Sequence, residues 1–384
     1  MATESLTVTL KTLTPIWTGG VETGKMDRVH ETGILGSLRW WCEAIVRGLG
    51  GMACDPSKHA CNFDAEKYEK ATELPERERL RASGLCDACQ LFGATGWRRR
   101  FRLVVDSRDL TETWSGGQIN VKPPDRNRGW YLNAGQMGTF HLKITADEDT
   151  QAQVLALIQF VARFGSLGAR PQLGYGLFEI TNVKNQPPST YQWDVTGGGS
   201  SHHGLPDLHT FTFFTLKFEP QSDDWWRDVP GIGSLARDRR YQNAVDRLLH
   251  HHLIPTTPAL KNVLRYGQPW SSGALPHQFF GTLRGEERSR SKIALSWAYQ
   301  QPNSAVWQIR GWTYPPQVGQ TQRQEVQQRL QTVLGQPETW LRALNVRYHT
   351  AEVAFAPAAM FFRPVTSAQV QQFVHEPSLA EVQR

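Results

Sequence analysis

The chain has 384 residues, of which 39% are hydrophobic and 20% charged, and this composition is typical of a folded protein with two domains. No apolar run approaches the roughly 20 residues that span a bilayer, and the N-terminal Met-Ala-Thr-Glu-Ser lacks the features of a secretory signal, so we expect a cytoplasmic protein. The net charge of +6 is modest, but several positive residues are bunched beside aromatic ones, which favours a polyanionic partner over a small acidic metabolite.

A strand and a helix joined by a polar loop begin the chain. Residues 5–13 alternate apolar and polar side chains, which predicts a half-buried strand. Residues 33–51 predict a helix that begins near Gly36, with Arg39, Glu43 and Arg47 on one side of it. Its other side would be buried through Leu35, Leu38, Cys42, Ile45, Val46 and Leu49. Gly33 and Gly36 would open the first-turn amides to an anion, although an ordinary amphipathic core helix explains the periodicity as well.

The irregular segment 52–90 carries four of the five cysteines, Cys54, Cys61, Cys86 and Cys89, spaced Cys-x6-Cys and Cys-x2-Cys. An odd number of cysteines in a chain without an export signal argues against a disulfide framework. Four thiolates around zinc could order a segment that has few apolar residues, so we expect a structural zinc site, with free thiols as the alternative. His59 could replace either of the first two cysteines as a ligand.

A basic stretch follows, in which arginine alternates with Trp97 and Phe101. Arg98, Arg99 and Arg100 would supply phosphate partners beside stacking surfaces, and a solvated strand edge is the competing interpretation. The stretch leads into a strand at 103–106 and then into a long excursion, residues 107–136. That excursion holds further cations and aromatic residues: Lys122, Arg126, Arg128, Trp114, Trp130 and Tyr131.

Residues 140–145 predict another strand and residues 149–164 a second helix. Residues 165–176 contain four glycines and would present backbone amides to an anion, with Arg170 and Tyr175 available for charge and stacking. A strand at 177–181 completes the order strand, helix, strand, strand, helix, strand, which is that of a ferredoxin-like βαββαβ unit.

Residues 184–208 are rich in Pro, Gly and Ser and predict a flexible linker, after which the order restarts. We expect strands at 210–218, 307–312 and 346–355, a helix through Leu249 opened by basic residues, and a helix at 320–334. Phe279-Phe280-Gly281-Thr282 and the basic residues after it echo Leu91-Phe92-Gly93-Ala94 as an internal repeat. The fold class is therefore α+β, with two ferredoxin-like (RRM-like) domains, residues 1–183 with the Cys-rich insert 52–90, and residues 209–384.

Four motifs together resemble the RAMP (repeat-associated mysterious protein) superfamily of CRISPR effectors, and within it the first subunit of the type III-B Cmr complex: Thr-Pro-Ile-Trp-Thr-Gly-Gly from Thr14, Gly-Ser-Leu-Arg-Trp-Trp from Gly36, Cys-x2-Cys-Gln-Leu-Phe-Gly from Cys86 and Leu-Gly-Tyr-Gly from Leu173. The resemblance is best over residues 6–181 and thinner over 210–363. It implies a non-catalytic subunit at the head of a filament of Cmr/RAMP subunits in antiviral defence, near the 3′ part of a guide RNA paired with target RNA.

The same resemblance implies an RNA-facing groove lined by Gly36, Ser37, Arg39, Gly174, Tyr175 and Gly176. With the basic and aromatic residues of the other motifs, Trp40, Arg98, Arg99, Arg100, Arg170, Arg290 and Lys292 complete the candidate RNA-binding set. In such complexes an aspartate of the backbone subunit cuts target RNA; Asp27 lies in a comparably placed loop, but its surroundings differ and the activity is not carried over. The alternative function is a RAMP-type endoribonuclease that processes precursor guide RNA with His30 as general base.

Overall fold

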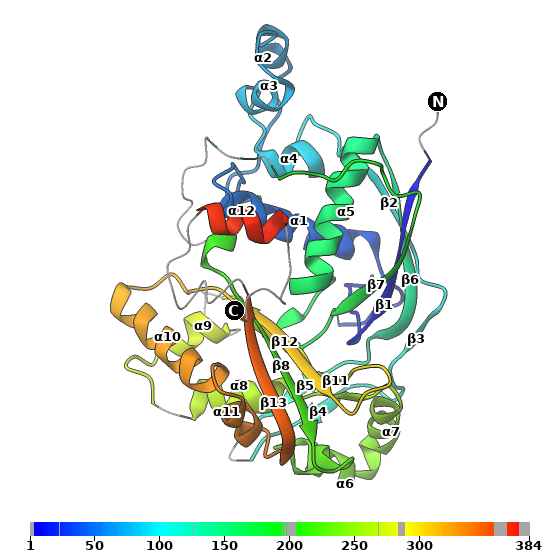
Figure 1. The fold of residues 1–384 in the computed structure, drawn as a ribbon, viewed down its shortest axis with the longest axis vertical. Helices are drawn as coiled ribbons and strands as arrows, with labels where there is room; N and C mark the ends of the chain where they lie inside the picture. Colours follow the sequence, from blue (N-terminus) through cyan, green and yellow to red (C-terminus); the bar gives the residue numbers. More distant parts are fainter. Residues whose placement is uncertain are drawn as a thin grey trace.

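The computed structural model describes residues 4–193 except 23 and 125, residues 195 and 197, residues 205–356 except 268 and 283–288, and residues 367–375 (Figure 1). In this part of the chain the first sheet has the strand order β2-β6-β1-β7, with β3 paired to β6. Its strands are β1 (Leu6–Thr12), β2 (Arg102–Asp106), β3 (Leu110–Glu112), β6 (Gln136–Thr145) and β7 (Phe178–Lys184), and all of their pairings are antiparallel.

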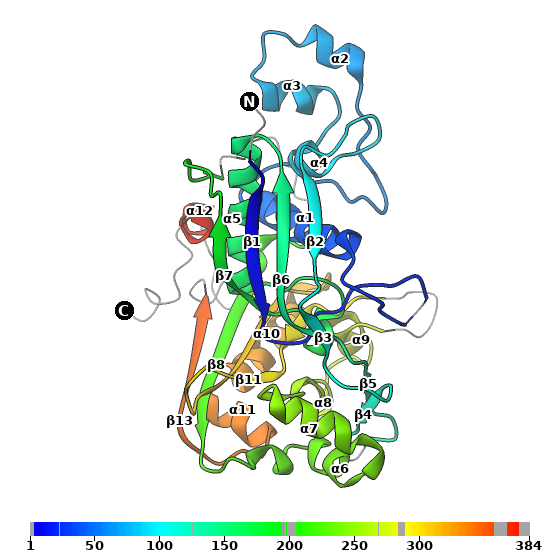
Figure 2. The same cartoon turned by 90° about the vertical axis from the view of Figure 1, so that its right-hand side faces the viewer.

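Two long helices pack against this sheet, α1 (Glu31–Gly48) and α5 (Glu148–Phe164) (Figure 2). The side chain of Asp147 caps α5 by accepting from the Thr150 amide at 2.9 Å, as an N-cap aspartate should. The predicted start of α1 near Gly36 is wrong, because the helix already begins at Glu31. The predicted apolar face is buried except for Leu35, which is half-buried.

The Cys-rich insert forms three short helices, α2 (Ala65–Lys70), α3 (Glu76–Ala82) and α4 (Asp87–Phe92). Helices α2 and α3 project beyond the rest of the molecule, whereas α4 lies against α1 (Figures 1 and 2). No residue of α2 is buried and α3 buries only Leu80, so this projection has little hydrophobic core of its own. Contacts other than apolar packing must therefore order it.

The long excursion forms β3 and then a two-stranded ribbon of β4 (Ile119–Val121) and β5 (Trp130–Leu132). Ile119, Val121 and Leu132 are buried in the second hydrophobic core, among residues of the C-terminal half. The excursion thus leaves the first sheet, forms a separate two-stranded sheet and contributes to the second hydrophobic core.

The second sheet has the order β13-β8-β12-β11-β9, with β10 paired to β12, in the described residues. Its strands are β8 (Thr212–Pro220), β9 (Leu253–Ile254), β10 (Ile293–Leu295), β11 (Ala298–Gln300), β12 (Trp307–Thr313) and β13 (Tyr348–Ala356). The helices around it are α6 (Ile232–Arg237), α7 (Gln242–His250), α8 (Thr257–Tyr266), α9 (Leu275–Phe280), α10 (Gln320–Leu334) and α11 (Pro337–Ala343).

The two sheets share one topology. When four strands of each half are numbered in chain order, the spatial order β7-β1-β6-β2 of the first sheet is 4-1-3-2. The order β13-β8-β12-β10/β11 of the second sheet is also 4-1-3-2. In both halves, helices follow the first and the third of these strands in the chain. Strands and helices near the expected positions occur in the expected chain order in each half, with further elements, such as β4, β5, α8 and α9, between them. None of the helices in the described ranges is both long and apolar enough to cross a membrane.

The two halves are not separated by a wholly free linker. Within the predicted linker, Trp193 and Val195 are buried in the first core, whereas residues 194, 196 and 198–204 lie outside the described part. Helix α12 (Ser367–His375), from the C-terminal end, also packs on the first core, where Phe373 lies 4.5 Å from Phe164 between ring centroids. Each half therefore contributes residues to the hydrophobic core of the other. Residues after 375 lie outside the described part.

Candidate nucleic-acid interface and metal centre

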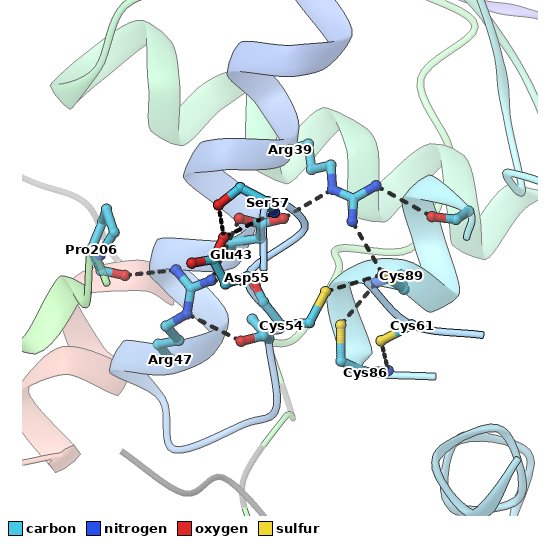
Figure 3. A network of polar contacts seen from close by, with 12 residues as sticks. Arg39, Glu43, Arg47, Cys54, Asp55, Ser57, Cys61, Cys86, Cys89 and Pro206 are labelled. Atoms are coloured by element: carbon cyan, nitrogen blue, oxygen red, sulfur yellow. Dashed lines mark hydrogen bonds and ion pairs between the residues drawn. The ribbon is translucent and has the colours of Figure 1, made fainter. Parts of the chain in front are cut away.

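The four cysteines of the insert converge at the start of α4. The ligand atoms of Cys54, Cys61, Cys86 and Cys89 all lie within 4.8 Å of one another, and the sulfurs of Cys54 and Cys89 are 3.6 Å apart (Figure 3). Four sulfurs at about 2.3 Å from one tetrahedral ion would be separated by about 3.8 Å. The donor set and its spacing therefore fit a closed four-thiolate metal site, and His59 is not part of the cluster.

Arg39 reaches from α1 into this cysteine cluster. Its guanidinium donates to Glu43 Oε1 at 2.9 Å, to the Gly93 carbonyl at 3.3 Å and to Cys89 Sγ at 3.1 Å (Figure 3). A positive charge beside sulfur stabilises thiolate, the form that binds metal. The side chain is thus held by three protein acceptors, and its contact with RNA stays a prediction.

The charged residues Arg39, Glu43 and Arg47 of α1 are buried or partly buried in the protein. Glu43 is buried, and burial raises the pKa of its carboxyl while Arg39 and Arg47 act in the opposite direction. Arg47 is nearly buried as well and donates to the carbonyls of Cys54 at 2.8 Å and Pro206 at 2.9 Å (Figure 3). The opposite, charged side of α1 is therefore a second packing surface, which binds the insert and the segment entering the C-terminal half.

A second ionic contact, within the insert, holds α3 against α4. Asp87, at the first position of α4, accepts from Arg77 at 2.9 Å, from Arg81 at 2.7 Å and from the Met52 amide at 2.7 Å. Because Asp87 is buried, these charge-assisted bonds compensate its desolvation. They connect α3, which lacks an apolar core, to the body of the protein.

The front of α1 differs from the predicted anion site. Glu31 places a carboxylate in the first turn, where it pairs with Arg28 at 3.0 Å, and the Gly33 amide bonds within that turn. Ser37 accepts a hydrogen bond from the Gly168 amide at 3.0 Å and so joins α1 to the glycine-rich loop. Gly36 is exposed, and open space surrounds the position of a Cβ there.

The glycine-rich loop is a junction between the two halves. Leu173 accepts a hydrogen bond from the Trp297 indole at 2.8 Å, and a Cβ on Gly174, at φ +96°, would lie 2.3 Å from that ring. Tyr175 is only 1% exposed and donates to the Asn133 carbonyl at 2.5 Å. Gly174, Tyr175 and Gly176 are all buried, so they present no surface to RNA in this structure.

Arg170 also belongs to this junction. It adopts φ +64°, its guanidinium lies 4.1 Å from the ring centroid of Trp17, and it donates to Asn133. Burial lowers the pKa of Arg170. The cation is therefore half-buried between aromatic and amide groups, and any contact with RNA stays a prediction.

The first basic turn, residues 97–102, follows α4. Arg98 is exposed, Arg99 donates to the Phe101 carbonyl at 2.6 Å, and Arg100 pairs with Glu76 at 3.2 Å. The Arg100 guanidinium also lies 5.8 Å from the Trp97 ring centroid. Arg98 is the cation of the predicted trio that the described contacts leave most available to a phosphate.

The second basic turn, residues 289–292, lies near α1. Arg290 is exposed, and the Lys292 ammonium lies 5.5 Å from the ring centroid of Tyr314. Burial raises the pKa of Tyr314 to about 12, against the charge of Arg290. Tyr314 in turn lies 6.3 Å from half-buried Trp40, so the structure brings three predicted RNA-binding residues, Trp40, Arg290 and Lys292, to one side of the junction.

The two basic turns are built alike. Gly93 ends α4 at φ +87°, ψ 160°, and Gly281 ends α9 at φ +81°, ψ 161°. The Arg100 amide donates to the Leu91 carbonyl at 3.1 Å, and the Lys292 amide donates to the Phe279 carbonyl at 2.8 Å. The internal repeat predicted from Phe-Gly is thus a repeat of backbone geometry.

The sequence interpretation missed Arg265 and His277. Arg265, on α8, donates to the Gly281 carbonyl at 3.4 Å and lies 2.9 Å from His277 Nδ1, as Arg39 does with Gly93 and Cys89. The signal was present in Leu-Arg-Tyr at 264–266 against Leu-Arg-Trp at 38–40, and in His-Gln-Phe-Phe-Gly at 277–281 against Cys-Gln-Leu-Phe-Gly at 89–93.

His30, the candidate general base, is the N-cap of α1. Its Nε2 lies 2.7 Å from Asp27 Oδ1, and this hydrogen bond lowers the pKa of Asp27. The imidazole is 19% exposed and the carboxylate 56%. A carboxylate bonded to one ring nitrogen leaves the other nitrogen of a neutral imidazole as a proton acceptor.

Comparison with known proteins gives one family match. The model of the RAMP superfamily matches residues 9–179. Among solved structures, the chain is similar to Cmr1 from Pyrococcus furiosus in its apo form, with 16% identity and a TM-score of 0.36 over 82% of this chain and 91% of that one. It is also similar to a chain of the type III-B Cmr-beta complex bound to cognate target RNA, with 11% identity and a TM-score of 0.37 over 85% of this chain and 99% of that one.

A third similar structure is Cmr6 from Pyrococcus furiosus, with 15% identity and a TM-score of 0.24 over 46% of this chain and 98% of that one. No curated protein matches the chain. The matched residues 9–179 include most of β1, all of α1, the cysteine cluster and the first basic turn. This part of the chain is therefore similar to the RAMP superfamily.

Proposed function

We propose that this chain is a non-catalytic, RNA-binding subunit of a type III-B CRISPR (Cmr) effector complex, made of two ferredoxin-like domains. Its partners are guide RNA, target RNA and other Cmr/RAMP subunits, and it contacts the guide–target duplex near the 3′ part of the guide. The match of residues 9–179 to the RAMP superfamily model and the motifs around Gly36, Cys86 and Gly174 support this role.

The observation that carries the proposal is the duplicated basic turn. In each half a helix arginine, Arg39 of α1 or Arg265 of α8, binds the carbonyl of a helix-ending glycine. This bond fixes a turn that exposes a cation, Arg98 in one half and Arg290 in the other. Fixed cations bind the regularly spaced phosphates of a nucleic acid without reading bases. Base pairing with the guide would then supply sequence specificity.

The remaining predicted residues have different parts in this proposal. Trp40 lies near the second basic turn through Tyr314, and Gly36 is exposed one helical turn earlier on α1; both would contact RNA directly. Ser37, Arg39, Gly174, Tyr175 and Gly176 hold the surrounding backbone through the contacts described above, and so position the groove. Four thiolates from Cys54, Cys61, Cys86 and Cys89 would hold a structural Zn²⁺, which leaves no ligand position for a catalytic water.

The test is RNA binding by the purified full chain, measured by fluorescence anisotropy at several salt concentrations with a guide strand and a guide–target duplex. Arg98→Ala/Arg290→Ala should weaken binding and lower the salt slope on the single strand by about 1.4, since each lost phosphate contact removes about 0.7. Arg108→Ala, an exposed arginine paired with Asp106 at 2.5 Å, is the matched control. Equal slopes for the double variant and the control would overturn the proposal.

The Asp27–His30 pair supports a second candidate function, processing of precursor guide RNA. Nδ1 of His30 would take the proton of a 2′-hydroxyl, and the 2′-oxygen would attack the adjacent phosphorus. The bond from phosphorus to the 5′-oxygen would break, and that oxygen would take a proton from water, giving a 2′,3′-cyclic phosphate and a 5′-hydroxyl. Incubation of precursor RNA with the chain, with His30→Ala and with Asp27→Asn separates the candidates. Site-specific cutting that needs His30 and yields cyclic phosphate ends would replace the non-catalytic assignment.

A further inference from the structure

The β4–β5 ribbon and α6 lie together at the end of the molecule opposite α2–α4 (Figure 2). A cationic hollow is lined by residues of both segments. Lys122 and Arg126 line it from the ribbon, and Arg227, Asp228 and Arg237 line it from the C-terminal half. A Cβ on Gly231, at φ +88°, would lie 2.9 Å from the backbone of Lys122, so the two walls are in direct contact. The hollow thus joins two basic segments that lie far apart in the sequence.

The charge of this hollow is strongly one-sided. Lys122, Arg227 and Arg237 are exposed, and Asp228 is the one acidic residue among the described lining residues. Arg227 is partly neutralised by Asp224 at 3.6 Å. In the described part of the chain, no carboxylate within ion-pair distance neutralises Lys122, Arg126 or Arg237. Converging unpaired cations attract a polyanion and hold its phosphates.

Arg126 is fixed in place before any ligand arrives. Its guanidinium lies 3.6 Å from the ring centroid of Tyr266, close enough for cation–π stacking. Its Nε is buried and has no hydrogen-bond partner among the described residues. A buried donor without an acceptor costs free energy, and an anionic oxygen beside the guanidinium would offset part of that cost.

Tyr266 connects the hollow to the second basic turn. It ends α8 directly after Arg265, whose guanidinium binds the Gly281 carbonyl, and it is 44% exposed. Arg126, Tyr266, Arg265 and the turn at Arg290 therefore form one contiguous series of cationic and aromatic groups. Alternating positive charge and exposed ring surface suits single-stranded RNA better than an acidic peptide, which has no bases to stack.

We propose that the hollow between the β4–β5 ribbon and α6 binds the phosphodiester backbone of single-stranded RNA, as a further site that continues from the second basic turn. This inference rests on the proposed RNA-binding function and extends it to unpaired RNA. Lys122 and Arg237 neutralise phosphates, Arg126 supplies a preorganised guanidinium, and Tyr266 offers a ring to a base.

The test measures anisotropy of fluorescein-labelled oligouridine with the full chain across a salt series. Lys122→Gln/Arg237→Gln should lower the salt slope by about 1.4, because two single-strand phosphate contacts are lost. The control is Arg240→Gln, which removes an exposed arginine close to Arg237 that already pairs with Asp238 at 2.6 Å. Photocrosslinking of 4-thiouridine RNA to Tyr266 or its neighbours should also be lost in the double variant.

Each other outcome has a definite meaning. If the double variant binds like Arg240→Gln while Arg98→Ala/Arg290→Ala is impaired, the hollow is not an RNA site and the proposed function stands. If the unmodified chain shows no salt-dependent RNA binding, both proposals are wrong. If polyglutamate, but not RNA, loses affinity in the double variant, the hollow is a docking site for an acidic protein segment and the RNA assignment is overturned.

Discussion

Arg265 binds the carbonyl oxygen of Gly281 at 3.4 Å in the same way that Arg39 binds that of Gly93 at 3.3 Å. The second terminal nitrogen of each guanidinium forms a hydrogen bond to the residue four positions before the glycine, His277 in one half and Cys89 in the other. The cysteine cluster has therefore been built around one copy of a duplicated contact. In the other copy a single histidine, without the cluster, completes the same geometry.

The helix-ending glycines should be required in both copies. A Cβ on Gly281 would lie 2.7 Å from the Ser289 carbonyl oxygen, and one on Gly93 would lie 2.9 Å from the Arg99 amide nitrogen, each at a positive φ that disfavours other residues. Gly93→Ala and Gly281→Ala should each lower the free energy of unfolding by about 1–3 kcal/mol. Chemical denaturation measures this free energy of unfolding. The control is Gly273→Ala, because the position of a Cβ on Gly273 is surrounded by open space. An equal loss of unfolding free energy in all three variants would contradict the argument.

Removal of one cysteine should release the metal and loosen the insert. Cys89→Ser is expected to abolish the one zinc per chain that elemental analysis should find in the natural sequence, and to make residues 52–90 sensitive to protease, since α2 and α3 have little core. Treatment with a chelator should have the same effect. Cys42→Ser is the control, because this buried thiol lies outside the cluster. Full metal content in Cys89→Ser would rule out the four-thiolate site.

Arg39→Ala separates a positioning role from direct RNA contact. The substitution removes bonds to Glu43, Gly93 and Cys89, so the free energy of unfolding should fall by about 2 kcal/mol or more. Arg265→Ala is the matched variant in the other half and should also destabilise the chain. For a positioning residue, RNA affinity should recover at low temperature, where the variant is folded. A lower salt slope with unchanged stability would instead show that Arg39 touches phosphate.

Local pattern was enough to predict strands such as β1 and β6, because half-buried strands alternate with period two, whereas the short strands β9 and β11 were not predicted. Pattern failed for α2 and α3, whose charged sequences Ala-Glu-Lys-Tyr-Glu-Lys and Glu-Arg-Glu-Arg-Leu-Arg-Ala have almost no apolar face. Ionic contacts to Asp87 hold α3. The start of α1 was placed too late because Glu31 and Thr32 are polar and Gly33 is a poor helix former.

The candidate site was predictable in its residue types but not in its orientation. Glycines and Tyr175 in a loop look like a ligand-binding surface, yet Trp297, more than a hundred residues later, covers Gly174. Such long-range packing leaves no local signal. The second basic turn was found through Phe-Gly. Its arginine was missed because Arg265 lies 16 residues before Gly281, whereas Arg39 lies 54 residues before Gly93, so the two arginines do not align by their distance in sequence.

Lys261 should make stability depend on pH. It is buried under the second basic turn, its ammonium lies 3.3 Å from Ser291 Oγ, and burial lowers its pKa from the ordinary 10.5 to about 7. Between these two values the unfolded chain holds a proton that the folded chain has released. The free energy of unfolding should therefore rise with pH from about 7 upward, with a slope approaching about 1.4 kcal/mol per pH unit.

Lys261→Met isolates this contribution, since it keeps the apolar stem and removes the titrating group. The variant should be more stable than the natural chain at pH 7, and the difference should shrink as the pH rises towards 9, as measured by denaturant unfolding at each pH. Lys143→Met, at an exposed lysine of β6, is the control and should leave the pH dependence unchanged. Parallel curves for the natural chain and Lys261→Met would mean that Lys261 stays protonated in the folded protein, and that the polar groups around Ser291 compensate its charge.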